Sequence, residues 1–209
     1  MNRIMVSYNK KYVEKASIKI APKRQPKNGY RYTLEIGLAS KKGSKDILMV
    51  IMMNPSMADD KVSDKTINRI TKYAWCKGYE KVLIYNSMPY YATTKKMVAE
   101  CEKKAEDRVL NKNMKNIENE LNNMKGKHLV LATGKPHSFF KEDVWKIHRI
   151  IKKNNIRFNV AQEKVNDEKI SKKGYTFHPI YSKNYLCDHI TEGKVLSLVQ
   201  GNPKELRIK

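Results

Sequence analysis

The sequence predicts an α/β protein with three layers (α/β/α) around a central, mainly parallel four-stranded sheet. The first observation is a set of short, continuously apolar runs, which are typical of strands buried on both faces of a sheet. The second is that segments with helical spacing of apolar residues separate these runs, so strands and helices alternate along the chain. Third, polar segments follow three of the runs, where open parallel sheets bind their ligands.

Each strand and helix is expected from a local pattern. After an alternating strand at residues 30–39, buried strands are expected at residues 47–53, 82–85, 128–133 and 157–160. Stripes of apolar residues predict helices at residues 64–77 and 100–125 and from about Phe140 to Ile151. Ser63 or Asp64 can cap the first of these helices, and Gly78 can end it.

Positive charge dominates the composition. The 209 residues include 43 Lys or Arg and 21 Asp or Glu, which gives a formal net charge of +22. Such an excess repels itself in the folded state, and neutralising phosphates releases counterions and adds affinity. We therefore expect DNA or RNA, including single strands, as a partner, although a lysine-rich composition that only favours solubility gives the same count. The sequence has no basic amphipathic helix with an aromatic face, so we expect no membrane partner.

The chain is expected to form one domain, residues 30–209, preceded by a basic arm at residues 1–29. That arm holds eight Lys or Arg residues and one acidic residue, and Val13, Ile18 and Ile20 offer at most a short strand. No apolar run is long enough to span a membrane, and the N-terminus lacks the apolar core of a signal peptide. The three cysteines lack metal-ligand spacing, so we expect reduced thiols in a cytoplasmic protein.

Three polar segments, at residues 53–59, 86–90 and 133–137, follow successive buried strands. Each alone is compatible with an ordinary turn. Because the carboxyl ends of parallel strands share one edge, we expect the segments to line one pocket, with Lys135 as either a phosphate-binding or a solvated residue. Divalent metal binding is the less favoured use of the acidic side chains in the first loop, which are more typical of helix caps: Asp59, Asp60 and Asp64.

A wider set of motifs resembles domain-of-unknown-function family 1643 of bacteria and phages. The resemblance covers about residues 30–186. It rests on Asn54-Pro55-Ser56-Met57-Ala58-Asp59, Asp64-Lys65-Thr66, Gly78-Tyr79, Asn86, Ala92-Thr93, Gly134 and His178-Pro179. That family implies no settled activity.

The order of three of these motifs is similar, more distantly, to that of the uracil-DNA glycosylase superfamily. The resemblance implies a uracil-DNA-glycosylase-like fold in which Asn54 positions the attacking water, Asn86 reads the base edge and His178 stabilises the departing base. We accordingly expect Asn54 and His178 to be catalytic, with no metal or other cofactor. The expected substrate-binding residues are Pro55, Ser56, Asp64, Asn86, Tyr90, Gly134 and Lys135.

The sequence departs from the superfamily at two places. Met52 stands where a glycine is usual, and residues 180–183, Ile-Tyr-Ser-Lys, replace the Ser-Pro-Leu-Ser wedge that often follows His-Pro. The wedge enters the duplex during base flipping, so its replacement favours a single-stranded substrate or a module without catalysis. The phenylalanine that stacks on the base has no clear match, and the candidates are Tyr73, Trp75, Tyr90 and Tyr91.

The chemistry of these residues suits cleavage of a base–sugar bond. Such cleavage places negative charge on the leaving base, which a histidine donor can stabilise, while an asparagine amide can orient water. Asn86 has a donor and an acceptor, which suits a pyrimidine edge. We therefore expect N-glycosidic bond hydrolysis in DNA or a nucleotide, at a uracil-like or modified pyrimidine. The alternative is a non-catalytic nucleic-acid-binding or phage- or defence-associated module with the same fold.

Overall fold

A computed structural model describes residues 6–22, 29–39, 45–161, 171, 175–179, 184–186, 194–196 and 198–206. The strands are β1 (Val13–Ala21), β2 (Thr33–Leu38), β3 (Ile47–Met52), β4 (Lys81–Asn86), β5 (Lys127–Ala132), β6 (Phe158–Ala161), β7 (Asn184–Leu186), β8 (Lys194–Leu196) and β9 (Leu198–Gln200). The helices are α1 (Lys65–Cys76), α2 (Lys95–Lys103), α3 (Asp107–Asn122), α4 (Lys141–Lys153) and the short 3-10 helix η2 (Pro203–Glu205).

The main sheet of the described residues has seven strands in the order β1-β2-β4-β3-β5-β6-β9. Its middle is parallel, because β3 pairs in parallel with β4 and β5, and β5 pairs in parallel with β6. The edges are antiparallel, with β1 and β2 beyond β4 and with β9 beyond β6. The predicted α/β class is therefore confirmed, whereas the predicted four-stranded, mainly parallel sheet is wrong.

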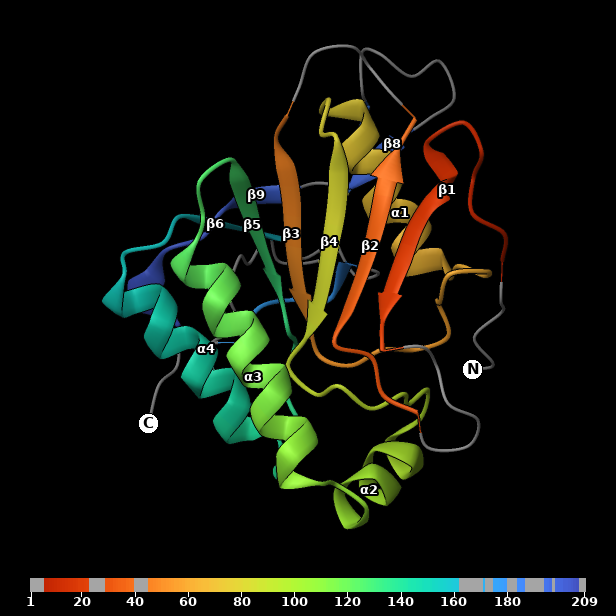
Figure 1. Cartoon of the computed structure of the whole chain (residues 1–209). Coiled ribbons are helices and arrows are strands. Elements are labelled where there is room, and N and C mark those ends of the chain that lie inside the picture. The colour runs from red at the N-terminus through yellow and green to blue at the C-terminus, as the bar shows by residue number, and fades with distance from the viewer. Residues whose placement is uncertain are drawn as a thin grey trace.

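Helices cover both faces of the sheet (Figure 1). Alternate residues of β3 point to opposite faces, so Leu48 and Val50 pack with Ile67 and Ile70 of α1, and Met49 packs against the other layer. That other layer is made of α3 and α4, which contribute apolar side chains to the core: Ile117, Leu121, Ile147 and Ile151. The small hairpin of β7 and β8 lies on the α1 side, where β8 contacts α1.

Local signals place the first helix as expected. The Asp64 side chain accepts hydrogen bonds from the N–H groups of Thr66 (2.8 Å) and Ile67 (2.9 Å), which are otherwise unpaired at a helix start. Gly78 follows the helix with a φ of 80°, a left-handed conformation that glycine adopts without strain. The predicted helix over residues 64–77 is therefore confirmed.

The long helix predicted over residues 100–125 is wrong, because the structure has two helices there. α2 ends at Lys103, and α3 begins at Asp107 after a short break. The phenol oxygen of Tyr90 accepts a hydrogen bond from the N–H of Glu106 (2.8 Å), so the break is held by a residue of another loop. A tertiary contact of this kind has no signature in the helical periodicity.

Part of the predicted basic arm belongs to the sheet. β1 is a nine-residue edge strand that pairs with β2, with a register shift between Val13 and Ile18. Tyr8 and Tyr12 are buried in the core cluster beside α1.

Cys76, the last residue of α1, is disulfide-bonded, so the expectation that it is a reduced thiol is wrong; Cys101 is a free thiol. None of the helices described here is long and apolar enough to cross a membrane.

Candidate functional site

The loops that follow β3, β4 and β5 gather at one edge of the sheet, where these parallel strands end (Figure 1). Backbone hydrogen bonds hold the first two loops together beyond the strands, from the N–H of Ser87 to Met52 (2.9 Å) and from the N–H of Met88 to Met53 (2.8 Å). The segment before β2 joins them, because the N–H of Arg31 donates to the carbonyl of Pro89 (2.8 Å). Three chain segments therefore meet at this edge.

Asn54 fastens the β3 loop to the β4 loop. Its Nδ2 donates to the carbonyl of Pro55 (2.9 Å) and to that of Ala92 (2.6 Å), and the N–H of Ala92 donates back to Pro55 (3.0 Å). Both N–H groups of the amide are thus engaged with backbone carbonyls. The remaining polar atom of this half-buried side chain is Oδ1, which is a hydrogen-bond acceptor.

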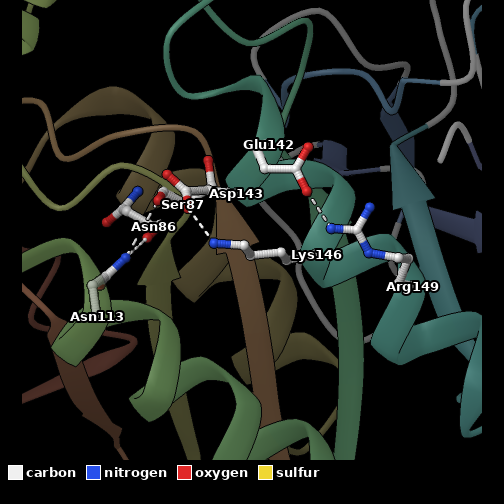
Figure 2. A network of polar contacts seen from close by, with 7 residues as sticks. All are labelled: Asn86, Ser87, Asn113, Glu142, Asp143, Lys146 and Arg149. Atoms are coloured by element: carbon white, nitrogen blue, oxygen red, sulfur yellow. Dashed lines mark hydrogen bonds and ion pairs between the residues drawn. The ribbon is translucent and has the colours of Figure 1, made fainter. Parts of the chain in front are cut away.

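Asn86 ends β4 and is completely buried, with an exposed fraction of 0%. Its Oδ1 accepts a hydrogen bond from Nη2 of Arg31 (3.0 Å). Its backbone carbonyl accepts one from Nδ2 of Asn113 in α3 (2.8 Å), and Asn113 also reaches the carbonyl of Ser87 (3.3 Å), as Figure 2 shows. Contacts from β4, α3 and the segment before β2 therefore fix the asparagine predicted to read a base.

Arg31 lies at this edge although it is not among the predicted site residues. Its guanidinium is buried, donates from Nη1 to the carbonyl of Ala58 (2.6 Å), and lies 5.8 Å from the ring centre of Tyr91. Burial lowers the pKa of Arg31, while Tyr91, Tyr8 and Asp64 act to raise it. An arginine between two tyrosines normally predicts a surface position, so no local signal identifies it.

Oδ1 of Asn113 is a buried acceptor without a hydrogen-bond partner within the part of the chain that the structure describes, and three buried groups in this region that can donate lack a partner as well. They are Nε of Arg31, Nδ2 of Asn86 and Oγ of Ser56. Each of these groups can donate a hydrogen bond, and an unsatisfied buried donor costs about 1–3 kcal/mol. The arrangement therefore suits a ligand that offers acceptor atoms.

The His178-Pro179 segment reaches the same edge through its neighbour Thr176. Oγ1 of Thr176 accepts a hydrogen bond from the N–H of Thr133 (3.0 Å), directly after β5, and both threonines are buried. Close by, Gly134 has a φ of 65°, and a Cβ atom there would lie 3.3 Å from Cε of Met53. His178 itself is half-buried. The structure thus brings the backbone before His178 to the end of β5.

Other predicted site residues have structural partners. Asp64 caps α1, and Tyr90 is buried against Met88 and Phe140 while its hydroxyl oxygen holds the start of α3. Pro55 is buried where the Asn54 side chain joins the β3 and β4 loops, whereas Lys135 is exposed.

The acidic residues of the first loop are also engaged. Oδ1 of Asp59 accepts hydrogen bonds from the N–H groups of Lys61 (2.8 Å) and Val62 (2.9 Å), which closes a tight turn. The carbonyl of the same residue accepts one from the Tyr8 hydroxyl (2.6 Å). No cluster of three or more His, Cys, Asp or Glu side chains that could hold a metal occurs in the residues covered by the structure.

An ionisable side chain with a perturbed pKa lies in the first turn of α4, the helix that follows the β5 loop. Asp143 is mostly buried, and burial raises its pKa to about 6, while Lys146 acts to lower it and Glu142 to raise it. Nζ of Lys146 lies 4.0 Å from Oδ1 of Asp143 (Figure 2). The apolar spacing of this helix predicts only a core element.

The sheet order and the strand-end loops define an α/β protein with a polar, donor-rich site at the carboxyl ends of its parallel strands. The model of the family described as protein of unknown function (DUF1643) matches residues 31–180, so the chain belongs to this family. This range includes the predicted motifs from Asn54 to His178-Pro179. Searches of curated proteins and of solved structures found no match.

Proposed function

We propose that this chain hydrolyses the N-glycosidic bond of a uracil-like or modified pyrimidine in DNA or a nucleotide, in a uracil-DNA-glycosylase-like fold. The observation that carries the proposal is that Asn54, Asn86 and the segment before His178 come from three distant parts of the chain and lie at one strand-end edge. Their order along the chain is the one that the distant resemblance implies.

In this proposal each residue has a defined task. Oδ1 of Asn54 accepts a hydrogen bond from the attacking water and orients it, since both of its N–H groups hold the loop. Asn86 binds the base, and His178 donates to the base as negative charge develops on it. The buried charge of Arg31, bonded to Asn86, stabilises the same developing anion, because electrostatic interactions are stronger away from water.

The test measures base release with enzyme in excess over labelled oligonucleotides that carry uracil, thymine mismatches or hydroxymethylated pyrimidines. Alkali-labile strand cleavage reports abasic sites. We expect cleavage by the wild type, and His178→Ala should reduce the rate about a hundredfold, the scale of losing one preorganised donor. Lys153→Gln, an exposed substitution at the far end of α4, is the matched control. If every oligonucleotide and free nucleotide stays intact with the wild type, the hydrolase proposal is refuted.

A second function is supported by the two hydrogen bonds through which the Asn54 side chain joins the β3 and β4 loops. Both N–H groups of that amide are used to join two loops, which is also the arrangement expected of a purely structural residue. The second candidate is therefore a nucleic-acid-binding or phage- or defence-associated module that binds without cleaving. Tight binding of an oligonucleotide with no base release in the same assay selects this function.

A further inference from the structure

The hydrogen bond between Arg31 and Asn86 determines how the Asn86 amide is oriented. A guanidinium group has only donors, so the atom that faces Nη2 of Arg31 at 3.0 Å must be the amide oxygen. The other half, Nδ2, is buried and has no partner among the described residues. The sequence alone allowed the Asn86 amide either orientation, and this contact directs its oxygen toward Arg31 and leaves Nδ2 without a partner among the described residues.

Arg31 is itself fixed, so it holds the amide in one orientation. Its Nη1 is bonded to the carbonyl of Ala58 at 2.6 Å, its charge lies over the ring of Tyr91, and 1% of the residue is exposed. Rotating the Asn86 amide by half a turn would place Nδ2 against Nη2, two donors with no acceptor between them. The backbone of Asn86 is fixed in addition by Asn113.

We infer that Arg31 fixes the Asn86 amide with Nδ2 as the group that meets the base, so that the site selects bases with a carbonyl at the recognised edge over bases with an amino group there. This inference rests on the proposed function and adds a specificity-determining residue to it. A uracil-like base presents a carbonyl oxygen at the position where a cytosine-like base presents an amino group. The carbonyl would satisfy Nδ2, whereas the amino group would face another donor.

The size of the discrimination follows from burial. Because Nδ2 is removed from water, a mismatched base leaves it unsatisfied and adds a second unsatisfied donor. The cost of one such group corresponds to a binding ratio of about tenfold to a hundredfold. The neighbouring donors, Nε of Arg31 and Oγ of Ser56, favour the same acceptor-rich ligands.

The experiment measures equilibrium binding of two single-stranded oligonucleotides that differ in one base, uracil or cytosine, on a 2′-fluorinated sugar that slows cleavage. The ratio of the two dissociation constants is compared among variants. We expect the wild type to prefer uracil about tenfold to a hundredfold. Arg31→Lys keeps a donor toward Asn86 and should keep the preference, whereas Arg31→Met frees the amide to rotate and should bring the ratio toward one.

Asn86→Asp provides a second test that does not alter Arg31. One carboxylate oxygen can accept from Arg31 and the other then presents an acceptor, so the preference should reverse toward cytosine. Circular dichroism melts identify any variant that fails to fold. Equal binding of uracil and cytosine by the wild type, or an unchanged uracil preference in Arg31→Met or Asn86→Asp, overturns the inference and leaves the proposed hydrolysis standing.

Failure of the proposed function has a different signature. An oligonucleotide with an abasic-site analogue in place of the base serves as the reference ligand. If the wild type binds the uracil and cytosine oligonucleotides no more tightly than this reference, then no base is read at the site. The proposed function and the inference that rests on it are then both refuted.

Discussion

The hydrogen bond from the N–H of Thr133 to Oγ1 of Thr176 is the contact that ties the His178-Pro179 segment to the sheet (3.0 Å). Thr176→Val tests it, because valine has nearly the same shape and lacks the oxygen. The N–H of Thr133 then stays buried without its acceptor, since that residue is 0% exposed and Thr176 is 2% exposed. An unsatisfied buried N–H costs about 1–3 kcal/mol, which sets the expected loss in the free energy of unfolding.

Urea denaturation followed by circular dichroism measures this loss. With a slope of about 2–3 kcal/mol per molar for a chain of this size, the midpoint should fall by roughly 0.3–1.5 M. Thr176→Ser is the matched control, because it keeps Oγ and should stay within about 0.5 kcal/mol of the wild type. Amide hydrogen exchange gives a local readout, and the N–H of Thr133 should exchange faster in the valine variant only.

The same substitution links stability to the proposed activity. Loss of the bond releases the backbone two residues before His178, so the valine variant should release base more slowly even under conditions where it remains folded. If Thr176→Val and Thr176→Ser unfold at the same urea concentration and protect the Thr133 amide equally, this hydrogen bond does not hold the segment. The assignment of His178 to the strand-end edge would then lose its structural basis.

Two further predictions concern ionisable groups at this end of the molecule. Burial raises the pKa of Asp143 in the folded state to about 6, above its unfolded value, so the folded state is stabilised as the pH falls from 7 toward 4. In urea titrations, Asp143→Asn should therefore stabilise the protein by about 1–3 kcal/mol at pH 7 and by little at pH 4. An equal effect at both pH values would contradict the buried position of this side chain. The affinity for nucleic acid should fall steeply as the salt concentration rises. Lys135→Gln should reduce the slope of log affinity against log salt on a single strand by about 0.7, because one phosphate contact is lost, whereas Lys153→Gln should leave the slope unchanged. The reverse ranking would show that Lys135 does not contact a phosphate.

The parallel part of the sheet was predictable because its strands are buried on both faces. Continuous apolar runs such as residues 47–52 and 82–85 leave no solvent face, and α1 carried its own start and stop signals in Asp64 and Gly78. The antiparallel edge strand β1 carried a weaker signal, which predicted at most a short strand from Val13, Ile18 and Ile20. Its apolar residues are separated by a register shift between Val13 and Ile18, so a period-two pattern is interrupted.

The position of β1 also changes how the charge of the N-terminus can be tested. Removing residues 1–29 would take away an edge strand together with the buried rings of Tyr8 and Tyr12. Loss of binding after such a truncation would report unfolding as readily as lost phosphate contacts. Single substitutions of exposed lysines, such as Lys10 or Lys11, separate the two effects.

Arg31 shows why part of the site was beyond sequence reasoning. Arginine is rarely buried, and when it is, a carboxylate usually pairs with it. Two hydrogen bonds of this guanidinium go instead to a carbonyl and an amide oxygen, and its burial is a consequence of the pairing between residues 29–31 and 89–91. That pairing joins parts of the chain about sixty residues apart, so no local window contains it.

The energetic cost of this arrangement argues for a role in binding. Removing a guanidinium from water costs several kcal/mol, and replacing a buried charge by an apolar side chain of similar volume is often neutral or stabilising. Among the Lys and Arg side chains that the structure describes, only Arg31 is in the buried class. A cation and two further unsatisfied donors at a strand-end edge lower the stability of the ligand-free fold, and a ligand with acceptor atoms would recover that free energy on binding. The features that local sequence rules fail to explain therefore coincide with the residues expected to recognise the substrate.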